Sequence, residues 1–370
     1  MQELDKGLFG AFAILTLFGL IMMSSISVAG SFDVTGRNDY YFWRHFIYIL
    51  IGIPVFFVAL KVPSDNIRRM ALPIFFSSIL LLLLVLTIGK NFGTAAQSWL
   101  KVGPFSFQPT EFVKISTAIF LAAIFSSGRN DAQSFEKGFI PFAIVSGIPV
   151  LLIAGQPDFG SIFVLCLIVA SIYFVAGANL KHFLGGIIFT LCTFLIIVLT
   201  TPYIKKRVQV LLNPELDPLG AGFQVKQGLI AIGSGGLFGR GFHNSIQKFD
   251  YLPEVQSDTI FSAISEEMGF FRILILIGIY IFVGYRGLII ARNAKSEFAQ
   301  LLAIGLTVFI VGQAFVNIGV NLAILPNTGI TLPLISYGGS SLLASFTAFG
   351  LLLNISSGEK NKKRKRNIFS

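Results

Sequence analysis

The sequence predicts an all-α membrane protein with about ten transmembrane helices and one large extracytoplasmic loop. Hydrophobic residues make up 54% of the chain and charged residues only 12%, about half of the share that is usual in soluble domains. Apolar runs of about 17–25 residues, each long enough to cross a hydrocarbon core, recur along the chain. A polar stretch at about 202–258 interrupts this pattern. Together these observations indicate a single transmembrane domain over residues 1–356.

Ten apolar runs are the predicted spans. Their expected limits are residues 7–29, 41–60, 70–89, 110–127, 139–155, 160–177, 183–201, 259–284, 299–324 and 338–355. No small-residue cleavage site stands out against the long first run, so we expect no cleavable signal peptide. Cys166 and Cys192 lie inside apolar runs and are interpreted as packing residues. His45, His182 and His243 have no ligand-like spacing, so no zinc site is expected.

Lysine and arginine are distributed unevenly between the two faces of the predicted bundle. They gather at both ends of the chain and in the connections at 61–69, 128–138, 178–182 and 285–298. The short loops on the other face hold only Arg37, Arg44, Lys90 and Lys101. By the positive-inside rule both termini are cytoplasmic, which puts the long connection at 202–258 outside the cytoplasm.

A basic tail at 357–370 follows the last predicted span. It holds six lysine and arginine residues between Lys360 and Arg366. Such a run can indicate a nucleic-acid partner, but no aromatic or base-reading pattern accompanies it. A cytoplasmic end beside anionic lipid is the favoured interpretation, and we expect no nucleic-acid partner.

Several ionisable side chains lie within or at the mouths of the predicted spans. Glu111 and Lys114 are three residues apart, so they share a helix face and can pair. Asp158 lies at the outer mouth between the fifth and sixth spans. A charge stranded in lipid costs about 2.5–3.5 kcal/mol on insertion scales. The Glu111–Lys114 pair therefore either serves function or fixes helix packing, and for Asp158 a role at the helix mouth is slightly favoured.

The eighth span carries a polar stripe. A projection at about 100° per residue places one set of residues on a single face, with Glu266 at its edge: Asp258, Ser262, Ser265, Gly269 and Arg272. Glu267 falls on the apolar side, which requires another helix to pack there. The stripe is expected to face a polar cavity with Asp258 at its outer rim, and we favour a functional role for this aspartate.

Two further segments are unusual. GSGGLFGRGF at 233–242 lacks the third glycine of a dinucleotide loop, so we interpret it as a glycine-rich turn that packs close to helix ends. LPNTGITLPLISYGGSS at 325–341 is broken by proline and glycine and yet apolar. It is either a loop that re-enters the membrane inside the protein or an ordinary loop.

Four stretches together resemble the SEDS family of bacterial cell-wall glycosyltransferases. They are QPTEFVK at 108–114, QPDFG at 156–160, YLPEVQSDTIFSAISEEMGF at 251–270, and the segment at 325–341. The resemblance runs from Asp5 to about Asn354. The wording of NSIQKFDYLPE at 244–254 is more similar to the division and sporulation branches than to the elongation branch. Ser98, which directly precedes Trp99, departs from the family, because the family often has an arginine at this position.

The resemblance implies a peptidoglycan polymerase of the bacterial plasma membrane that uses lipid II. It implies that Asp258 is essential, that Glu111 and Lys114 line a central cavity, and that Asp158 is important. It further implies a class B penicillin-binding protein as transpeptidase partner, with other membrane proteins of the division or elongation complex. The active site is then expected on the outer face.

Asp258 is the predicted general base of this chemistry. An acceptor hydroxyl must displace a lipid pyrophosphate from the donor's anomeric carbon with inversion, and a base that removes its proton contributes about 10²–10⁴-fold. The leaving pyrophosphate needs positive charge, from a divalent cation (Mg²⁺ or Mn²⁺) or from basic side chains. Glu266 and Ser336 are further candidates to face the cavity. Basic candidates in the long loop are Lys205, Lys206, Arg207 and Arg240.

Two other functions remain open from the sequence. A lipid II flippase or secondary transporter would use Glu111, Lys114 and Asp158 as an ion path, as midplane charges often do. The two halves of the chain, however, show no obvious inverted repeat. A scaffold that only recruits a transpeptidase would leave the buried charges unexplained.

Overall fold

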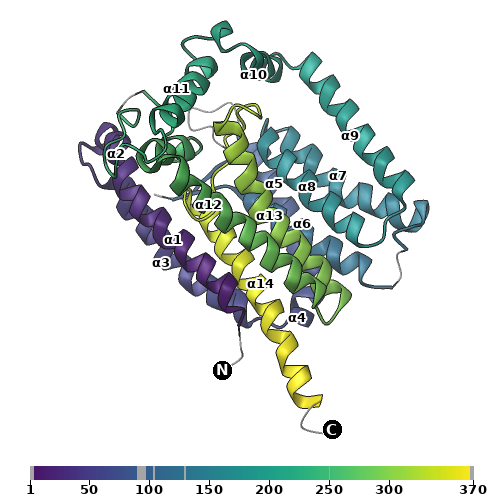
Figure 1. Ribbon diagram of the computed structural model, residues 1–370. Helices are drawn as coiled ribbons and strands as arrows, with labels where there is room; N and C mark the ends of the chain where they lie inside the picture. The colour runs from purple at the N-terminus through teal and green to yellow at the C-terminus, as the bar shows by residue number, and fades with distance from the viewer. Residues whose placement is uncertain (1–3, 90–96, 103–104, 129–130, 250, 367–370) are drawn as a thin grey trace.

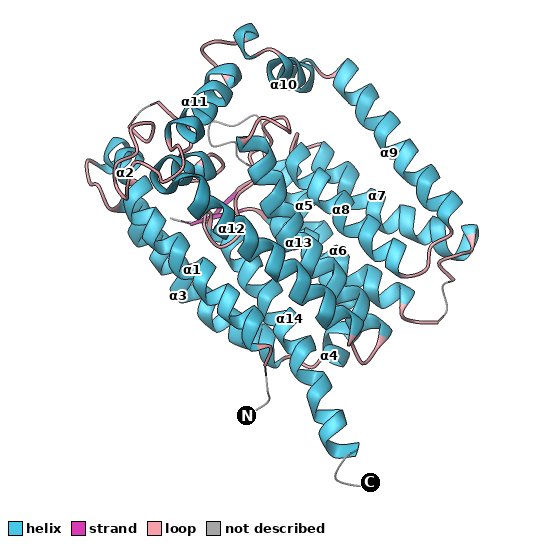
Figure 2. Ribbon diagram, in the orientation of Figure 1, coloured by secondary structure: helices cyan, strands magenta, loops and turns pink. Residues whose placement is uncertain are grey.

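The structure is a computed structural model that describes residues 4–89, 97–102, 105–128, 131–249 and 251–366. Figure 2 shows a bundle of helices with one short antiparallel hairpin. The hairpin pairs β1 (Leu100–Val102) with β2 (Phe105–Phe107), so that Leu100 lies opposite Phe107. The all-α fold class predicted from the sequence is confirmed.

Ten of the described α-helices coincide with the predicted spans. They are α1 (Lys6–Ile26), α3 (Tyr40–Lys61), α5 (Ala71–Ile88), α6 (Pro109–Phe125), α7 (Ile140–Ala154), α8 (Phe159–Val175), α9 (Leu180–Thr200), α12 (Ile260–Arg292), α13 (Glu297–Asn321) and α14 (Gly339–Arg366). Among the described residues, seven helical segments are long and apolar enough to cross a membrane. The count of ten spans stays a prediction, because α6, α8 and the described part of α9 do not meet that criterion.

Shorter elements connect these helices. They are α2 (Val28–Thr35), α4 (Ser64–Arg69), a π-helical turn at Phe135–Phe139, α10 (Pro202–Leu212), a 3₁₀ turn at Pro214–Leu216, and α11 (Ala221–Ser234). The predicted long loop at 202–258 is thus partly helical. The last helix, α14, continues to Arg366 and projects beyond the bundle (Figure 1). The predicted tail at 357–370 therefore begins as an extension of this helix.

The centre of the bundle is formed by α13 and α14. Within their membrane-length windows, 78% and 89% of the residues are buried, whereas lipid-facing helices expose one side. Small residues allow close packing: Gly52 of α3 lies against the ring of Phe346, and Gly350 of α14 lies against the main chain of Phe56. This core holds α3, α6, α8 and α12 around α13 and α14 (Figure 1).

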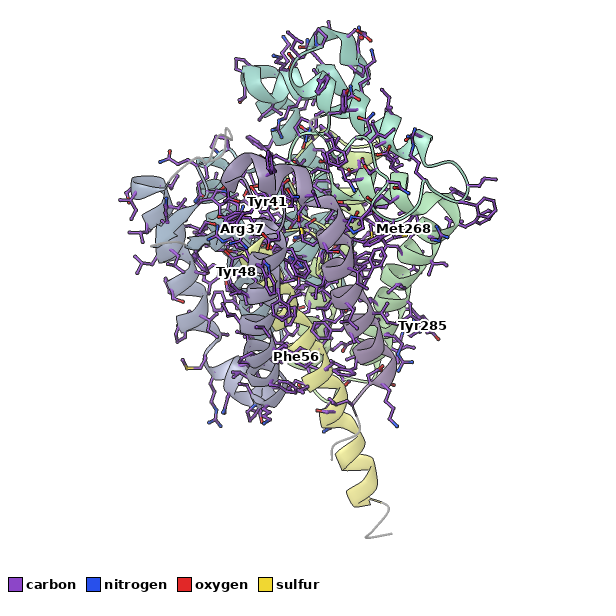
Figure 3. All side chains as sticks on the ribbon, turned by 90° about the vertical axis from the view of Figure 1, so that its left-hand side faces the viewer. Arg37, Tyr41, Tyr48, Phe56, Met268 and Tyr285 are labelled. Carbon is purple, nitrogen blue, oxygen red and sulfur yellow. The ribbon has the colours of Figure 1, made fainter. Side chains whose placement is uncertain are left out.

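The two ends of the bundle differ. The start of α1 and the end of α14 lie at one end, and α10 and α11 lie at the other (Figure 1). Figure 3 shows the same order along two helices: Tyr41 and Met268 lie towards the end with α10 and α11, whereas Phe56 and Tyr285 lie towards the end with the termini. We call the end that carries α10 and α11 the loop end.

The segment at 325–338 becomes buried inside the protein from Ile330 onward, whereas residues 325–329 are half-buried or exposed. Ile330, Leu332 and Ile335 have exposed fractions of 5% or less. The carbonyl of Pro333 accepts a hydrogen bond from the Tyr280 hydroxyl of α12. Tyr280 lies eleven residues (280 − 269), or about 16 Å of helix, beyond Gly269. Of the two interpretations from the sequence, a segment that re-enters between the helices matches this burial, because irregular main chain at membrane depth must be enclosed by protein.

Candidate functional site

Asp258 lies at the loop end, two residues before α12 begins. Its main-chain carbonyl accepts hydrogen bonds from two amide side chains of α13, Asn317 Nδ2 at 2.9 Å and Asn321 Nδ2 at 2.8 Å. The segment before it is also held. Tyr337 donates its backbone N–H to the carbonyl of Gln256 at 2.8 Å. These contacts fix the main chain of Asp258 between α13 and the buried segment.

The Asp258 carboxyl is buried with one oxygen unused. None of the described residues hydrogen-bonds to Oδ1. Burial raises the pKa of the carboxyl to about 7, and the nearby negative charge of Glu254 acts in the same direction. The Arg207 guanidinium and the Gln224 side chain lower the pKa. A carboxyl in this state is half ionised near neutral pH and is suited to accept a proton.

Two helices of the long connection reach this site. Arg207 of α10 donates a hydrogen bond to the carbonyl of Asn327, and Asn327 Nδ2 donates to Gln224 Oε1 of α11 at 2.6 Å. Arg207 is therefore the predicted basic residue that the structure brings to Asp258. Lys205 is exposed, and Lys206 pairs with Asp217 at 3.1 Å.

Ser336 holds the main chain beside Asp258. Its hydroxyl donates to the carbonyl of Ser257 at 2.5 Å and accepts from the N–H of Leu332 at 2.7 Å. These two bonds join the buried segment to the residue that precedes Asp258. Ser336 therefore acts on the main chain of this segment, whereas the sequence predicted that it faces the cavity.

Glu266 is an anchor for the glycine-rich turn instead of a cavity-facing group. Arg240 Nε lies 3.4 Å from Glu266 Oε1. The carboxylate also accepts hydrogen bonds from the hydroxyls of Ser234 and Ser245 and from the backbone N–H groups of Ile246 and Gln247. Because these donors enclose the fully buried Glu266, it and Arg240 position the main chain at 240–247.

The break in α12 at Gly269 corrects the predicted polar stripe. Gly269 has φ 73°, outside the helical range, so a projection at a constant angle does not continue past it. Arg272 is exposed and donates to the carbonyls of Phe238 and Met268. It therefore stabilises the break and does not share a face with Asp258.

The glycine-rich turn packs against this break, as the sequence predicted. Arg240 and Gly241 donate their backbone N–H groups to the carbonyls of Glu266 and Glu267, and Phe270 donates to Gly236. A Cβ on Gly239 would lie 2.2 Å from the carbonyl oxygen of Glu267. The turn thus provides backbone partners to the groups that the interrupted helix leaves without them.

Glu267 has the partner that its apolar surroundings require. Its carboxylate accepts hydrogen bonds from Lys248 Nζ at 3.0 Å and from Ser25 Oγ of α1 at 2.6 Å. The helix that was required on this side of α12 is α1. Lys248 was not among the predicted site residues, because its partner is nineteen residues away (267 − 248) across an irregular turn.

Glu111 and Lys114 form the predicted ion pair. Lys114 Nζ lies 2.8 Å from Glu111 Oε1 and 2.8 Å from Gln313 Oε1 of α13, and both charged side chains are buried. No described residue hydrogen-bonds to Glu111 Oε2. Gln313 Nε2 in turn donates to the Thr331 hydroxyl at 3.2 Å. The pair therefore connects through α13 to the buried segment.

Asp158 caps the start of α8. Its carboxylate accepts hydrogen bonds from the N–H and hydroxyl of Ser161 at 3.0 and 2.8 Å and from Gln108 Nε2 at 3.2 Å. This is the helix-mouth position that the sequence favoured. Ser98, where the family often has arginine, is buried beside the hairpin.

Sequence reasoning missed a stripe of amides on α13. Gln313, Asn317 and Asn321 recur every four residues on one face of this apolar helix and connect the Lys114 region to Asp258. Their spacing was visible in the sequence. These amides carry no charge, so a search for ionisable groups in the predicted spans does not find them.

The described residues do not provide a dedicated metal site. They include no group of three or more His, Cys, Asp or Glu side chains that could hold an ion. Cys166 and Cys192 are free. Because the described part of the chain brings no such donor set together, we assign no step to a resident cation, and the predicted divalent cation stays a prediction.

The family model described as Cell cycle protein, which groups FtsW, RodA and SpoVE, matches residues 6–361. The chain belongs to this family. The FtsW-like resemblance is confirmed by curated relatives. A probable peptidoglycan glycosyltransferase FtsW of Idiomarina loihiensis is 39% identical over 95% of this chain and 86% of the relative. Stage V sporulation protein E of Bacillus subtilis is 39% identical over 93% of this chain and 94% of the relative.

Solved structures of the FtsW, RodA and SpoVE family share the fold. One solved chain has a TM-score of 0.81 at 28% identity, over 97% of this chain and 99% of the other. Its structure is described as structural coordination of polymerization and crosslinking by a peptidoglycan synthase complex. RodA of Thermus thermophilus has a TM-score of 0.72 at 27% identity, over 96% of this chain and 97% of the other. The multi-pass membrane architecture is therefore that of the family.

Proposed function

We propose that this protein is a peptidoglycan glycosyltransferase that polymerises lipid II into glycan strands, with Asp258 as general base. The observation that carries the proposal is the buried Asp258 carboxyl, whose Oδ1 has no hydrogen-bond partner among the described residues and whose pKa is about 7. The printed name of the FtsW relatives, probable peptidoglycan glycosyltransferase, supports the reaction class.

The proposed reaction uses the unpartnered oxygen of Asp258. The acceptor sugar's hydroxyl donates to Oδ1, and the carboxylate takes its proton as the hydroxyl oxygen attacks the donor's anomeric carbon. The bond from that carbon to the lipid pyrophosphate breaks on the opposite side, which inverts the anomeric configuration. The leaving pyrophosphate takes the bonding electron pair, so it needs a positive partner. Arg207, already near Asp258, is the proposed partner.

The remaining features of the proposal concern location and partners. The distribution of lysine and arginine supports cytoplasmic termini, and the loop end then lies on the outer face of the membrane with Asp258. The solved relative from a peptidoglycan synthase complex supports a transpeptidase partner, for which we propose a class B penicillin-binding protein. Other division or elongation proteins would join through that complex.

The function is tested with purified protein in detergent, supplied with lipid II and Mg²⁺. Wild-type protein is expected to form glycan polymer, and Asp258→Asn is expected to abolish polymer while the protein stays folded. The matched control is Asp217→Asn, which removes a loop aspartate that pairs with Lys206 and should retain polymerase activity. A parallel reaction with EDTA tests the divalent cation.

Two results would contradict the proposal. Polymer at the wild-type rate from Asp258→Asn would remove this residue from the mechanism. Movement of lipid II across vesicles that contain the wild-type protein, with no polymer formed, would indicate a flippase instead.

A further inference from the structure

The amide stripe of α13 holds the main chain of the proposed general base. Asn317 and Asn321 lie one helical turn apart and have exposed fractions of 1% and 6%. Both Nδ2 atoms donate to the same acceptor, the carbonyl oxygen of Asp258. Buried amides are costly unless they are paired, so their presence in an apolar helix requires a reason. The shared acceptor indicates that they hold the main chain of Asp258 in place.

Asn321 joins the Asp258 carbonyl to the first turn of α12. Its Oδ1 accepts from the backbone N–H of Ser262 at 3.3 Å and from the Ser262 hydroxyl at 2.7 Å. Because Oδ1 is occupied by these donors, the amino group faces the carbonyl of Asp258. The network thereby determines the orientation of this amide.

Asn317 joins the same carbonyl to the buried segment. Its Nδ2 donates to the carbonyl of Asp258 at 2.9 Å and to the carbonyl of Ile330 at 2.7 Å. The two asparagines thus hold three parts of the chain together: Asp258 itself, the first turn of α12, and the segment at 325–338. All three meet at Asp258.

The main chain and the side chain of Asp258 differ in their hydrogen bonding. Its main-chain oxygen has two donors, whereas its side-chain Oδ1 has none among the described residues. Because the asparagines bind only the main-chain oxygen, they fix the position of Asp258 and leave Oδ1 of its carboxylate for an incoming hydroxyl, while Gln224 bonds to the side chain. Displacement of a reacting group by about 1 Å can cost about 10²-fold in rate.

We propose that Asn317 and Asn321 are positioning residues for Asp258, which direct its carboxylate at the acceptor hydroxyl by holding its main chain. This inference rests on the proposed function, since it assigns the residues that place the proposed base. Neither asparagine touches the reacting atoms. Each acts through Asp258.

The surroundings of Asp258 indicate a readout that a purely structural role would not change. The charged groups that act on its carboxyl are Glu254 of its own segment and Arg207 of α10, and α11 contributes the neutral amide of Gln224. The α13 amides are neutral too and bind the main-chain oxygen of Asp258. Loss of an asparagine would loosen the site and admit water. Because burial is the main cause of the raised pKa, hydration lowers the pKa towards its ordinary value.

The test measures polymerisation by the single variants Asn317→Ala and Asn321→Ala. We expect kcat at neutral pH to fall about 10- to 100-fold, with the KM for lipid II nearly unchanged. The acid limb of the pH–rate profile should move to lower pH. The matched control is Asn354→Ala of α14, whose Nδ2 also holds main-chain carbonyls, those of Leu60 and Val62, at the opposite end of the bundle. It should change Tm without changing kcat or the pH profile.

Rates are expressed per folded protein, measured as the monodisperse fraction. If an alanine variant does not fold, Asn317→Ser and Asn321→Ser, which retain one donor, replace it. Wild-type kcat and an unmoved pH profile in folded variants would overturn the inference, and so would failure of the serine variants to fold. Polymer from the wild type that depends on Asp258 but not on these asparagines would overturn this inference alone. Absence of polymer from the wild type would overturn the proposed function.

Discussion

Lys248 and Glu267 form a buried ion pair beside the break in α12, with Nζ 3.0 Å from Oε1 and neither side chain exposed by more than 1%. The Ser25 hydroxyl of α1 also donates to Glu267, and Lys248 Nζ also donates to the carbonyl of His243. The pair therefore joins α1, α12 and the turn that precedes the Asp258 segment. The pairing and these additional hydrogen bonds offset the cost of burying two charges in an apolar part of the protein.

Loss of one member of this pair should destabilise the protein strongly. Lys248→Met leaves the Glu267 carboxylate buried without its cation, for which we expect a loss of about 3–5 kcal/mol in the free energy of unfolding. Thermal unfolding of detergent-purified protein measures the effect as a lower Tm. The control is Lys206→Met, which breaks the largely exposed pair with Asp217 and should lower Tm far less. Equal losses from the two variants would contradict the buried pair.

Alanine at Gly239 should prevent correct folding of the turn. The residue has φ +82°, and a Cβ there would lie 2.2 Å from the main-chain oxygen of Glu267, so both backbone conformation and space exclude a side chain. We expect little monodisperse protein on size-exclusion chromatography. Gly233→Ala is the matched control, since nothing lies within 4 Å of its added Cβ and alanine favours the helix by up to about 1 kcal/mol. Normal yields of Gly239→Ala would rule out the close packing.

The pH dependence of polymerisation should follow the Asp258 carboxyl. A general base acts when it is deprotonated, so with a pKa of about 7 the rate should be half-maximal near that pH and fall about tenfold per unit below it. Glu254→Gln removes a negative charge that raises this pKa and should move the acid limb to lower pH. Arg207→Gln removes a positive charge that lowers it and should move the limb to higher pH.

The two variants are compared in the same buffer series, with Glu136→Gln as control. Glu136 is exposed and belongs to the π-helical turn before α7, so this variant should leave the profile in place. Shifts of the two test variants in the same direction would contradict the assignment of the limb to Asp258.

Substitution at Asp158 separates capping from chemistry. Asp158→Ala removes the acceptor for the Ser161 N–H at the start of α8 and should cost about 0.5–2 kcal/mol. Asp158→Asn keeps a side-chain oxygen that can cap the helix and should retain Tm. Both are measured by thermal unfolding and by polymer formation. A fully folded Asp158→Asn protein without activity would show that the carboxylate serves more than the helix mouth.

The helix positions and Asp258 could be predicted because their signals are local in the sequence. Long apolar runs specify helices in a membrane protein, since the main chain must satisfy its own hydrogen bonds there. Asp258 stood out as an acidic residue between a polar stretch and an apolar run. The Glu111–Lys114 pair was predictable for a similar reason, as its members are three residues apart on one helix.

Other features could not be predicted from local signals. The projection of α12 placed Arg272 beside Asp258 because it assumed a regular helix. The φ angle of Gly269 is irregular where the glycine-rich turn, which lies outside the local pattern of α12, supplies backbone partners. The Lys248–Glu267 pair required the turn to fold back onto α12 and α1. The sequence predicted that Ser336 lies near the site, but it could not predict the hydrogen bonds of its hydroxyl with Ser257 and Leu332.

By itself, the sequence determined that this chain is a helical membrane protein and that Asp258 is a carboxylate placed where polar and apolar segments meet. Only the tertiary structure decided how that carboxylate is held. Asn317, Asn321 and the segment at 325–338 reach it from sequence positions more than fifty residues away. The reason is physical: hydrophobic periodicity depends on neighbours along the chain, whereas each hydrogen bond to a buried polar group depends on the distance and angle between atoms that folding brings together.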